Sequence, residues 1–172
     1  IGSISLLILV MLLTSVAGAQ TAPSAIPSND NFANARPIKI GKSYTVEDIE
    51  NATVEAGQPH VTSCGGATVI NHSVWFSVHL PAYSRIYLST EGTNLTGPLY
   101  DTYDTVIAIF SGPGLGALTQ EGCNDNAGSL FSELVVTLTG NNTYYVLAGT
   151  YSAAPFDPTS VFKLITRIKL SY

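Results

Sequence analysis

The chain has 172 residues, of which 45% are hydrophobic and only 11% are charged. This length suits one domain of ordinary size, and the hydrophobic content argues against intrinsic disorder. The formal net charge is −5 with seven Lys and Arg residues, too few cations to neutralise a row of phosphates, so nucleic-acid binding is excluded.

The first nineteen residues form an uncharged segment in which thirteen are apolar. One interpretation is a secretory signal peptide, with Ala17-Gly18-Ala19 as the cleavage site before Gln20. As a single α-helix the segment would measure about 28 Å, close to the hydrocarbon thickness of a bilayer. Its central apolar residues are Ile4, Leu6, Leu7, Ile8, Leu9, Val10, Met11, Leu12, Leu13 and Val16.

A second interpretation is that this segment is retained in the native protein. The chain begins at Ile1 and not at Met, and an apolar, already processed N-terminus of this kind resembles that of an archaeal type IV pilin. The resemblance implies a helix that first lies in the membrane and then packs in the core of a filament. Ser5 stands where bacterial type IV pilins carry Glu, so the usual bacterial pilus is not implied. We favour retention, with apolar burial of this segment driving assembly.

Residues 20–28 form a linker rich in Pro, Ser and Ala, in which Pro23 and Pro27 end any preceding helix. From residue 29 to residue 172, short runs of β-branched and aromatic residues alternate with Gly, Asn, Asp and Pro, which is typical of an all-β sandwich or barrel. We expect strands over residues 33–38, 43–48, 73–80, 84–90, 104–111, 117–120, 133–139, 143–151 and 161–170.

Alternation of side chains assigns faces to several of these strands. Leu134, Val136 and Leu138 share one face. Residues 106–110 are apolar on both faces, which predicts a central strand covered on both sides. In the last strand, Phe162, Leu164, Ile168 and Leu170 share one face, and Lys163, Arg167 and Lys169 share the other.

Six short motifs follow one another in the β-rich part of the chain. They occupy residues 29–35, 52–60, 73–77, 103–112, 123–126 and 142–149. In this order and spacing, residues 29–172 resemble the bacterial pre-peptidase C-terminal domain. The resemblance implies a jelly-roll-like antiparallel β-sandwich, here preceded by the hydrophobic N-terminal α-helix. It also implies a secreted or surface location and a non-catalytic role.

Cys64 and Cys123 are the two cysteines of the chain. Because cysteines of exported proteins usually pair in an oxidising compartment, we predict a disulfide between them. The alternative is a pair of free, buried thiols.

A calcium site is a further hypothesis. Asp101, Asp104, Asn124, Asp125 and Asn126 offer hard oxygen ligands. The family resemblance brings their two loops close together, and relatives of this fold, including collagen-binding modules, hold calcium. Asn-Asp runs are also ordinary turn formers, and the ligand spacing of an EF-hand is absent. No other cofactor is expected.

Four N-glycosylation sequons begin at Asn51, Asn71, Asn94 and Asn141. They suit an exported surface protein that carries glycans.

The charges are distributed unevenly along the chain. Between Ser43 and Phe162 there are eleven acidic residues and one basic residue, Arg85. The basic face of the final strand, Lys163, Arg167 and Lys169, either solvates an exposed edge strand or meets the acidic body of a neighbouring subunit. The second contact would be heterologous and able to repeat without closing.

Catalysis has little support in the sequence. His60, His72 and His79 do not have metal-ligand spacing, and neither a nucleophile elbow nor a phosphate-binding glycine loop occurs. His79 falls on the same strand face as Trp75 and Ser77, which predicts a partly exposed sheet surface. We expect a protein that is not an enzyme.

The favoured interpretation is a structural subunit of an extracellular filament on the cell surface, a homopolymer whose subunits lie in the membrane before assembly. The alternative is a monomeric secreted binding module from which residues 1–19 are removed. In that case Trp75, Tyr100 and Tyr103 are candidates for sugar or protein contacts, with packing in the core as the alternative for Trp75.

Overall fold

The computed structural model describes residues 25–67, 69–93, 104–128, 130–151, 153 and 162–168. The expected helix over residues 1–19 and the linker up to residue 24 lie outside these ranges. Within the described ranges, no helix has the length and hydropathy needed to cross a bilayer. The elements are η1 (Phe32–Asn34), β1 (Arg36–Pro37), β2 (Ser43–Val46), η2 (Ile49–Asn51), β3 (Asn71–Leu80), β4 (Ser84–Ser89), β5 (Thr105–Ser111), η4 (Leu115–Ala117), β6 (Thr119–Asn124), β7 (Glu133–Leu138), β8 (Asn142–Thr150) and β9 (Phe162–Ile168).

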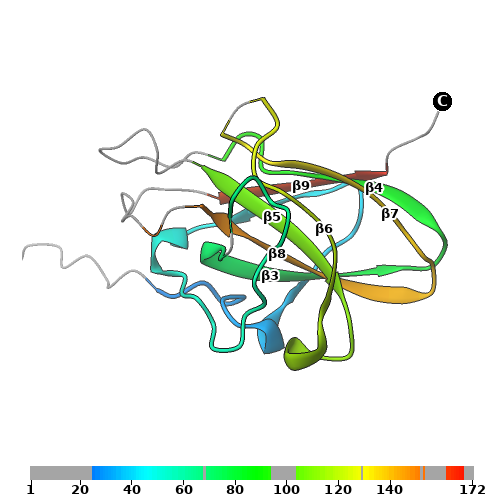
Figure 1. Cartoon of the computed structure of the whole chain (residues 1–172), viewed down its shortest axis with the longest axis horizontal. Coiled ribbons are helices and arrows are strands. Elements are labelled where there is room, and N and C mark those ends of the chain that lie inside the picture. Colours follow the sequence, from blue (N-terminus) through cyan, green and yellow to red (C-terminus); the bar gives the residue numbers. More distant parts are fainter. Residues whose placement is uncertain are drawn as a thin grey trace, which may run out of the picture.

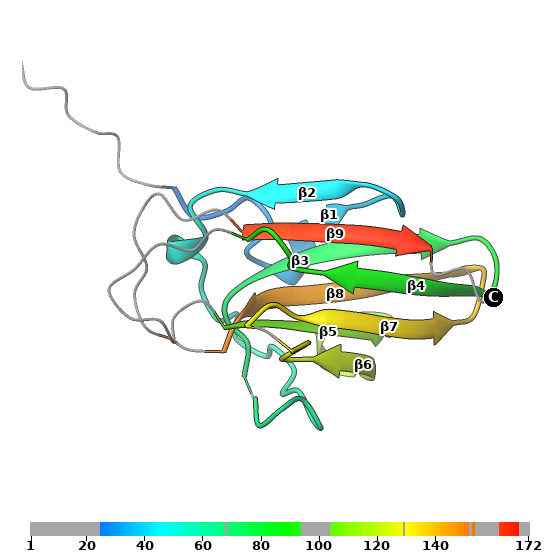
Figure 2. The same ribbon diagram turned by 90° about the horizontal axis from the view of Figure 1, so that it is seen from above.

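The strands form two packed sheets, so the predicted all-β sandwich is confirmed. One sheet has five strands in the order β1-β3-β8-β5-β6, and the other has four in the order β2-β9-β4-β7. Both orders can be followed from top to bottom in Figure 2. The expectation of a purely antiparallel sandwich is wrong at one pair, because β1 runs parallel to β3.

Two predicted strands differ from the structure. Residues 33–38 form η1 and then the two-residue strand β1, because Pro37 has no N–H to extend a ladder. The strand predicted over residues 117–120 instead runs from Thr119 to Asn124, where it pairs with β5. A periodic pattern does not reveal this longer strand, because Gly122 and Asn124 are poor strand formers.

The main core fills the space between the two sheets. The predicted inward face of β7 is confirmed, since Leu134 and Leu138 are buried and Val136 packs against the same cluster. Phe162 and Leu164 of β9 are buried there as well. Alternating residues of all the long strands therefore meet between the sheets, as expected for a sandwich.

A second core lies on the outer face of the five-stranded sheet, where Trp75, Val106, Phe110 and Leu147 are almost fully buried. Residues 52–67, which we call the cover segment, cross this face in front of β5, β8 and β3 (Figure 1). Their contribution to the second core is Val61, Cys64 and Ala67. Because Ile107 and Ile109 point into the main core, β5 is covered on both faces, as predicted.

The cover segment is fixed to the sheet edge by covalent and polar bonds. Cys64 forms a disulfide with Cys123 of β6, with 5.7 Å between their Cα atoms. Beside it, Gln120 accepts a hydrogen bond from the N–H of Thr62 at 2.9 Å and donates one to the carbonyl of Thr62 at 2.8 Å. The segment is thus held to an edge strand near its C-terminal end.

We predict that replacing both cysteines, Cys64→Ser with Cys123→Ser, lowers the free energy of unfolding by about 4 kcal/mol. The reason is that the disulfide spans 59 residues and restricts the unfolded chain. Chemical denaturation monitored by tryptophan fluorescence measures the loss. The parent chain in dithiothreitol should match the double variant, and an unchanged denaturation midpoint would contradict the prediction.

Candidate binding surface

The outer face of the four-stranded sheet is the open face of the sandwich. Ile86 and Leu88 of β4 point into the core, so the alternating residues Arg85 and Tyr87 point outward. On the neighbouring strands the same face carries further exposed or half-buried side chains. The exposed or half-buried residues of the outer face are Thr45, Arg85, Tyr87, Glu133, Val135, Thr137, Lys163 and Arg167. Ser89 and Ile165 lie on the same face but are buried.

Tyr87 lies at the centre of this outer face and joins three strands. The guanidinium carbon of Arg167 lies 5.6 Å from the centroid of its ring, within cation–π range. The hydroxyl of Tyr87 donates a hydrogen bond of 2.7 Å to Glu133. Partial burial, with a contribution from Glu133, raises the pKa of Tyr87. The phenol therefore stays protonated and remains a hydrogen-bond donor at neutral pH.

The basic face predicted for the final strand is present in part. Lys163 and Arg167 point outward, and Lys169 lies outside the described residues. The edge-strand interpretation is wrong, because β9 lies between β2 and β4. Its cations therefore stand within a continuous sheet face and do not guard an open edge.

Asp125 is a buried carboxyl near the disulfide, with 3% of its surface exposed. Among the described residues its Oδ1 has no hydrogen-bond partner, and desolvation raises its pKa. Gly65, at φ +56°, lies so close that a Cβ there would be 2.4 Å from Oδ2 of Asp125. A side chain at position 65 would thus displace this carboxyl.

Buried hydroxyl groups form hydrogen bonds to the main chain next to Asp125. The hydroxyls of Thr90 and Thr105 share a hydrogen bond of 2.6 Å, and both accept from the N–H of Ser132. Ser132 in turn donates its hydroxyl to the carbonyl of Asp125 at 2.9 Å. All three hydroxyl residues are fully buried, and each hydroxyl has a hydrogen-bond partner, as buried polar groups require.

The predicted calcium ligands are brought only partly together in the described structure. Asn124 uses its side-chain oxygen to accept from the N–H of Glu133 at 2.9 Å and donates to the carbonyl of Asn126. Asp101 lies outside the described residues. In the part of the chain that is described, no three His, Cys, Asp or Glu side chains group as a metal site. Calcium binding stays a prediction.

The expectation for the His79 strand face needs correction. His79 is exposed, but Trp75 is fully buried under residues 29–35, which we call the N-terminal segment. Phe32 of this segment packs edge-on to Trp75 with 5.2 Å between ring centroids. Trp75 is therefore wrong as a candidate ligand contact. Tyr100 and Tyr103 lie outside the described residues.

The asparagines of the four sequons differ in their hydrogen bonding and exposure. Asn71 donates its amide to the carbonyl of Tyr151 at 2.8 Å, and Asn51 donates to Glu50 at 3.0 Å. Asn141 is exposed in the turn between β7 and β8, with φ +54°. Asn94 lies outside the described residues.

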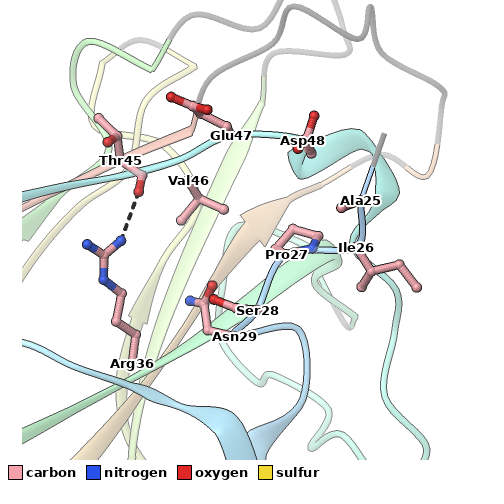
Figure 3. A pocket seen from close by; sticks show the side chains of 10 residues that line it. All are labelled: Ala25, Ile26, Pro27, Ser28, Asn29, Arg36, Thr45, Val46, Glu47 and Asp48. Atoms are coloured by element: carbon pink, nitrogen blue, oxygen red, sulfur yellow. Dashed lines mark hydrogen bonds between the residues drawn. The ribbon is translucent and has the colours of Figure 1, made fainter. Parts of the chain in front are cut away.

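Two hollows flank the edge of the sandwich where the chain crosses from one sheet to the other. The first, with a volume of about 390 Å³, lies between residues 25–29 and β2 (Figure 3). Arg36 points into it and donates to the carbonyl of Thr45 at 3.0 Å. The second is a groove of about 730 Å³ lined mainly by apolar side chains, with Lys39 and His79 among its walls. Sequence patterns did not predict either hollow.

Comparisons with known proteins give a structural likeness. No family model matches the chain, and no curated protein matches it. A similar solved structure is the pre-peptidase C-terminal domain of a collagenase from Bacillus anthracis, with a TM-score of 0.46 and 10% sequence identity. The match covers 77% of this chain and 94% of that domain. No residue role is carried over from it.

We predict that Asp125→Asn stabilises the protein at neutral pH. The folded pKa lies above its ordinary value of 3.8, so the folded state binds this proton more tightly than the unfolded state does. Stability contributed by the proton is therefore lost as pH rises through the interval from 3.8 to the folded pKa. The variant should have a higher Tm at pH 7 and a flatter Tm profile at acid pH.

Thermal denaturation in the presence of a chelator measures this effect, with the exposed Glu121→Gln as the control that should not change the profile. A lower Tm for Asp125→Asn at pH 7 would contradict the prediction. A parent Tm that drops on chelation, together with an insensitive Asp125→Asn variant, would support the calcium hypothesis instead.

We predict that Asn141 is glycosylated and Asn71 is not when the chain is secreted by a host with N-glycosylation. A glycan on Asn71 would disrupt a hydrogen bond that is made in the folded state, whereas Asn141 is exposed. Peptide mapping by mass spectrometry reports the occupancy of each site. An Asn141→Gln variant should lose one glycan, and occupancy of Asn71 alone would contradict the prediction.

Proposed function

We propose that this protein is a secreted, non-enzymatic β-sandwich module that binds an anionic polysaccharide on the outer face of its four-stranded sheet. The observation that carries the proposal is the Arg167–Tyr87–Glu133 row at the centre of this face. Arg85 stands beside the row, opposite Thr137 of β7. This open face contrasts with the opposite sheet, whose outer face is occupied by the cover segment.

The chemistry of the outer face suits a negatively charged sugar chain. Guanidinium groups bind carboxylate or sulfate groups through two parallel hydrogen bonds. The hydroxyls of Thr45 and Thr137 can exchange hydrogen bonds with sugar hydroxyls. A gently twisted sheet surface also offers an extended contact, which suits a polymer better than a small molecule.

Secretion is supported by the disulfide, because such bonds persist in oxidising compartments. The strand orders β2-β9-β4-β7 and β3-β8-β5-β6 support assignment of the sandwich to the jelly-roll class. A filament subunit is the second candidate function. The residues expected to form its core helix lie outside the described ranges. Lys42, Arg85 and Arg167 gather at one end of the four-stranded sheet and Glu47 and Glu91 at the other, a separation of charge that favours self-association.

Isothermal titration of the protein with polygalacturonate, with neutral dextran as the comparison, tests the proposal. We expect binding to polygalacturonate alone, weakened by salt. The double variant Arg85→Gln with Arg167→Gln should raise Kd by about tenfold or more, because charge-assisted hydrogen bonds are lost.

The matched control is Lys39→Gln with Lys42→Gln, which removes the same charge away from the outer face and should keep most of the affinity. Equal loss in both double variants would indicate a general charge effect and contradict the assignment of the face. Binding of neither polymer, or of both equally, would overturn the proposed ligand.

A further inference from the structure

Strand register collects charges of opposite sign at the two ends of the sandwich. The end that holds the β3–β4 and β7–β8 turns, at the right of Figure 2, comprises residues 38–43, 79–86, 136–144 and 165–168. These segments contain the cations Lys39, Lys42, Arg85 and Arg167 and no carboxylate. The β5–β6 turn reaches the same end, because Ser111 pairs with Tyr144, and it adds one carboxylate, Glu121, which accepts from the Ser111 hydroxyl. We call this the basic end.

The opposite end comprises residues 45–50, 89–93, 104–105 and 124–128. These segments contain no Lys or Arg, but two cations lie beside them: Lys163 of β9 is next to Gly92, and Arg36 donates to the carbonyl of Thr45 in the hollow shared with Glu47 and Asp48. The acidic residues of this end are Glu47, Asp48, Glu50, Glu91, Asp104 and Asp125. We call it the acidic end. We propose that the basic end of one copy of this chain docks on the acidic end of a second copy.

The basic end has an apolar groove beside its cations. The groove of about 730 Å³ opens at this end, between residues 37–40 and the end of β3. Its apolar wall includes Ile40, Leu80 and Pro81, and the exposed Lys39 stands at its rim. Beyond Pro37 the strand β1 stops, so His79 and Leu80 of β3 have a ladder partner only on β8.

The acidic end presents a matching projection. Ile26 is 59% exposed, and it borders the same hollow as Glu47 and Asp48 (Figure 3). Glu47 and Glu91 are both exposed carboxylates. Ile26 therefore presents an apolar side chain to solvent beside acidic groups. The apolar groove and the lysines of the basic end complement these two features.

A second copy is the occupant that this arrangement favours, because each end complements the other in charge and in apolar character. The contact uses two different surfaces, so it leaves one end of each kind free and can extend without closing. Arg85 and Arg167 belong both to the basic end and to the face proposed to bind polysaccharide, whereas Lys39 and Lys42 lie off that face, so varying the two lysines separates the two proposals. The energy of the contact should fall as salt screens the exposed charges.

Sedimentation velocity of the full chain tests the proposal with two charge-reversed variants. The first, Lys39→Glu with Lys42→Glu, removes the net positive charge of the basic end, and the second, Glu47→Lys with Glu91→Lys, cuts the net negative charge of the acidic end. We expect the parent to show a sedimentation coefficient that rises with concentration at low salt. Each variant alone should remain monomeric, and an equimolar mixture of the two should associate again.

The control variant, Ala33→Glu with Asn34→Glu, adds charge on η1 near the middle of the sandwich and should associate like the parent. The parent should dissociate in roughly 0.5 M salt, where the Debye length is only about 4 Å. A monomeric parent at every concentration would overturn the proposal. So would association that persists in both reversed variants, or a mixture that fails to restore it. Polygalacturonate binding by the monomeric Lys39→Glu, Lys42→Glu variant at Arg85 and Arg167 tells failure of this proposal from failure of the proposed function.

Discussion

The whole structure depends on the requirement that β5 be buried on both faces. Its five central residues, 106–110, are apolar without alternation and no more than 1% exposed. The facing sheet covers Ile107 and Ile109, but Val106, Ala108 and Phe110 would meet water without the cover segment. Exposed, they would form the kind of contiguous apolar patch that promotes aggregation. The disulfide between Cys64 and Cys123 holds the cover in place.

This requirement makes the two sheet faces unequal. The outer face of the five-stranded sheet carries the cover segment and the N-terminal segment, where Phe32 packs on Trp75 and Tyr145. The four-stranded sheet has no comparable layer among the described residues, and its outer face keeps Tyr87 and its charged neighbours in solvent. Because β5 is apolar on both sides, the outer face of the five-stranded sheet has to be covered. The outer face of the four-stranded sheet is therefore the one left open for binding.

The same strand order also organises the electrostatics. Residues from distant parts of the chain, such as Lys42, Arg85 and Arg167, come to one end because β9 pairs with both β2 and β4. Acidic residues that follow β2 and β4 come to the other end. A net negative chain therefore acquires a basic surface, which its total charge alone does not indicate.

The sequence by itself determined the fold class, the inward faces of β7 and β9 and the double burial of β5, because these follow from local hydrophobic periodicity. It also identified Cys64 and Cys123 as partners, since no other cysteines were present. Only the tertiary structure decided that residues 52–67 form a cover, that Trp75 lies beneath the N-terminal segment and that β9 is internal. These features depend on which strands become neighbours, and contacts between residues far apart in the chain leave no periodic signal. The row formed by Tyr87, Glu133 and Arg167 is of this kind, since each residue comes from a different strand.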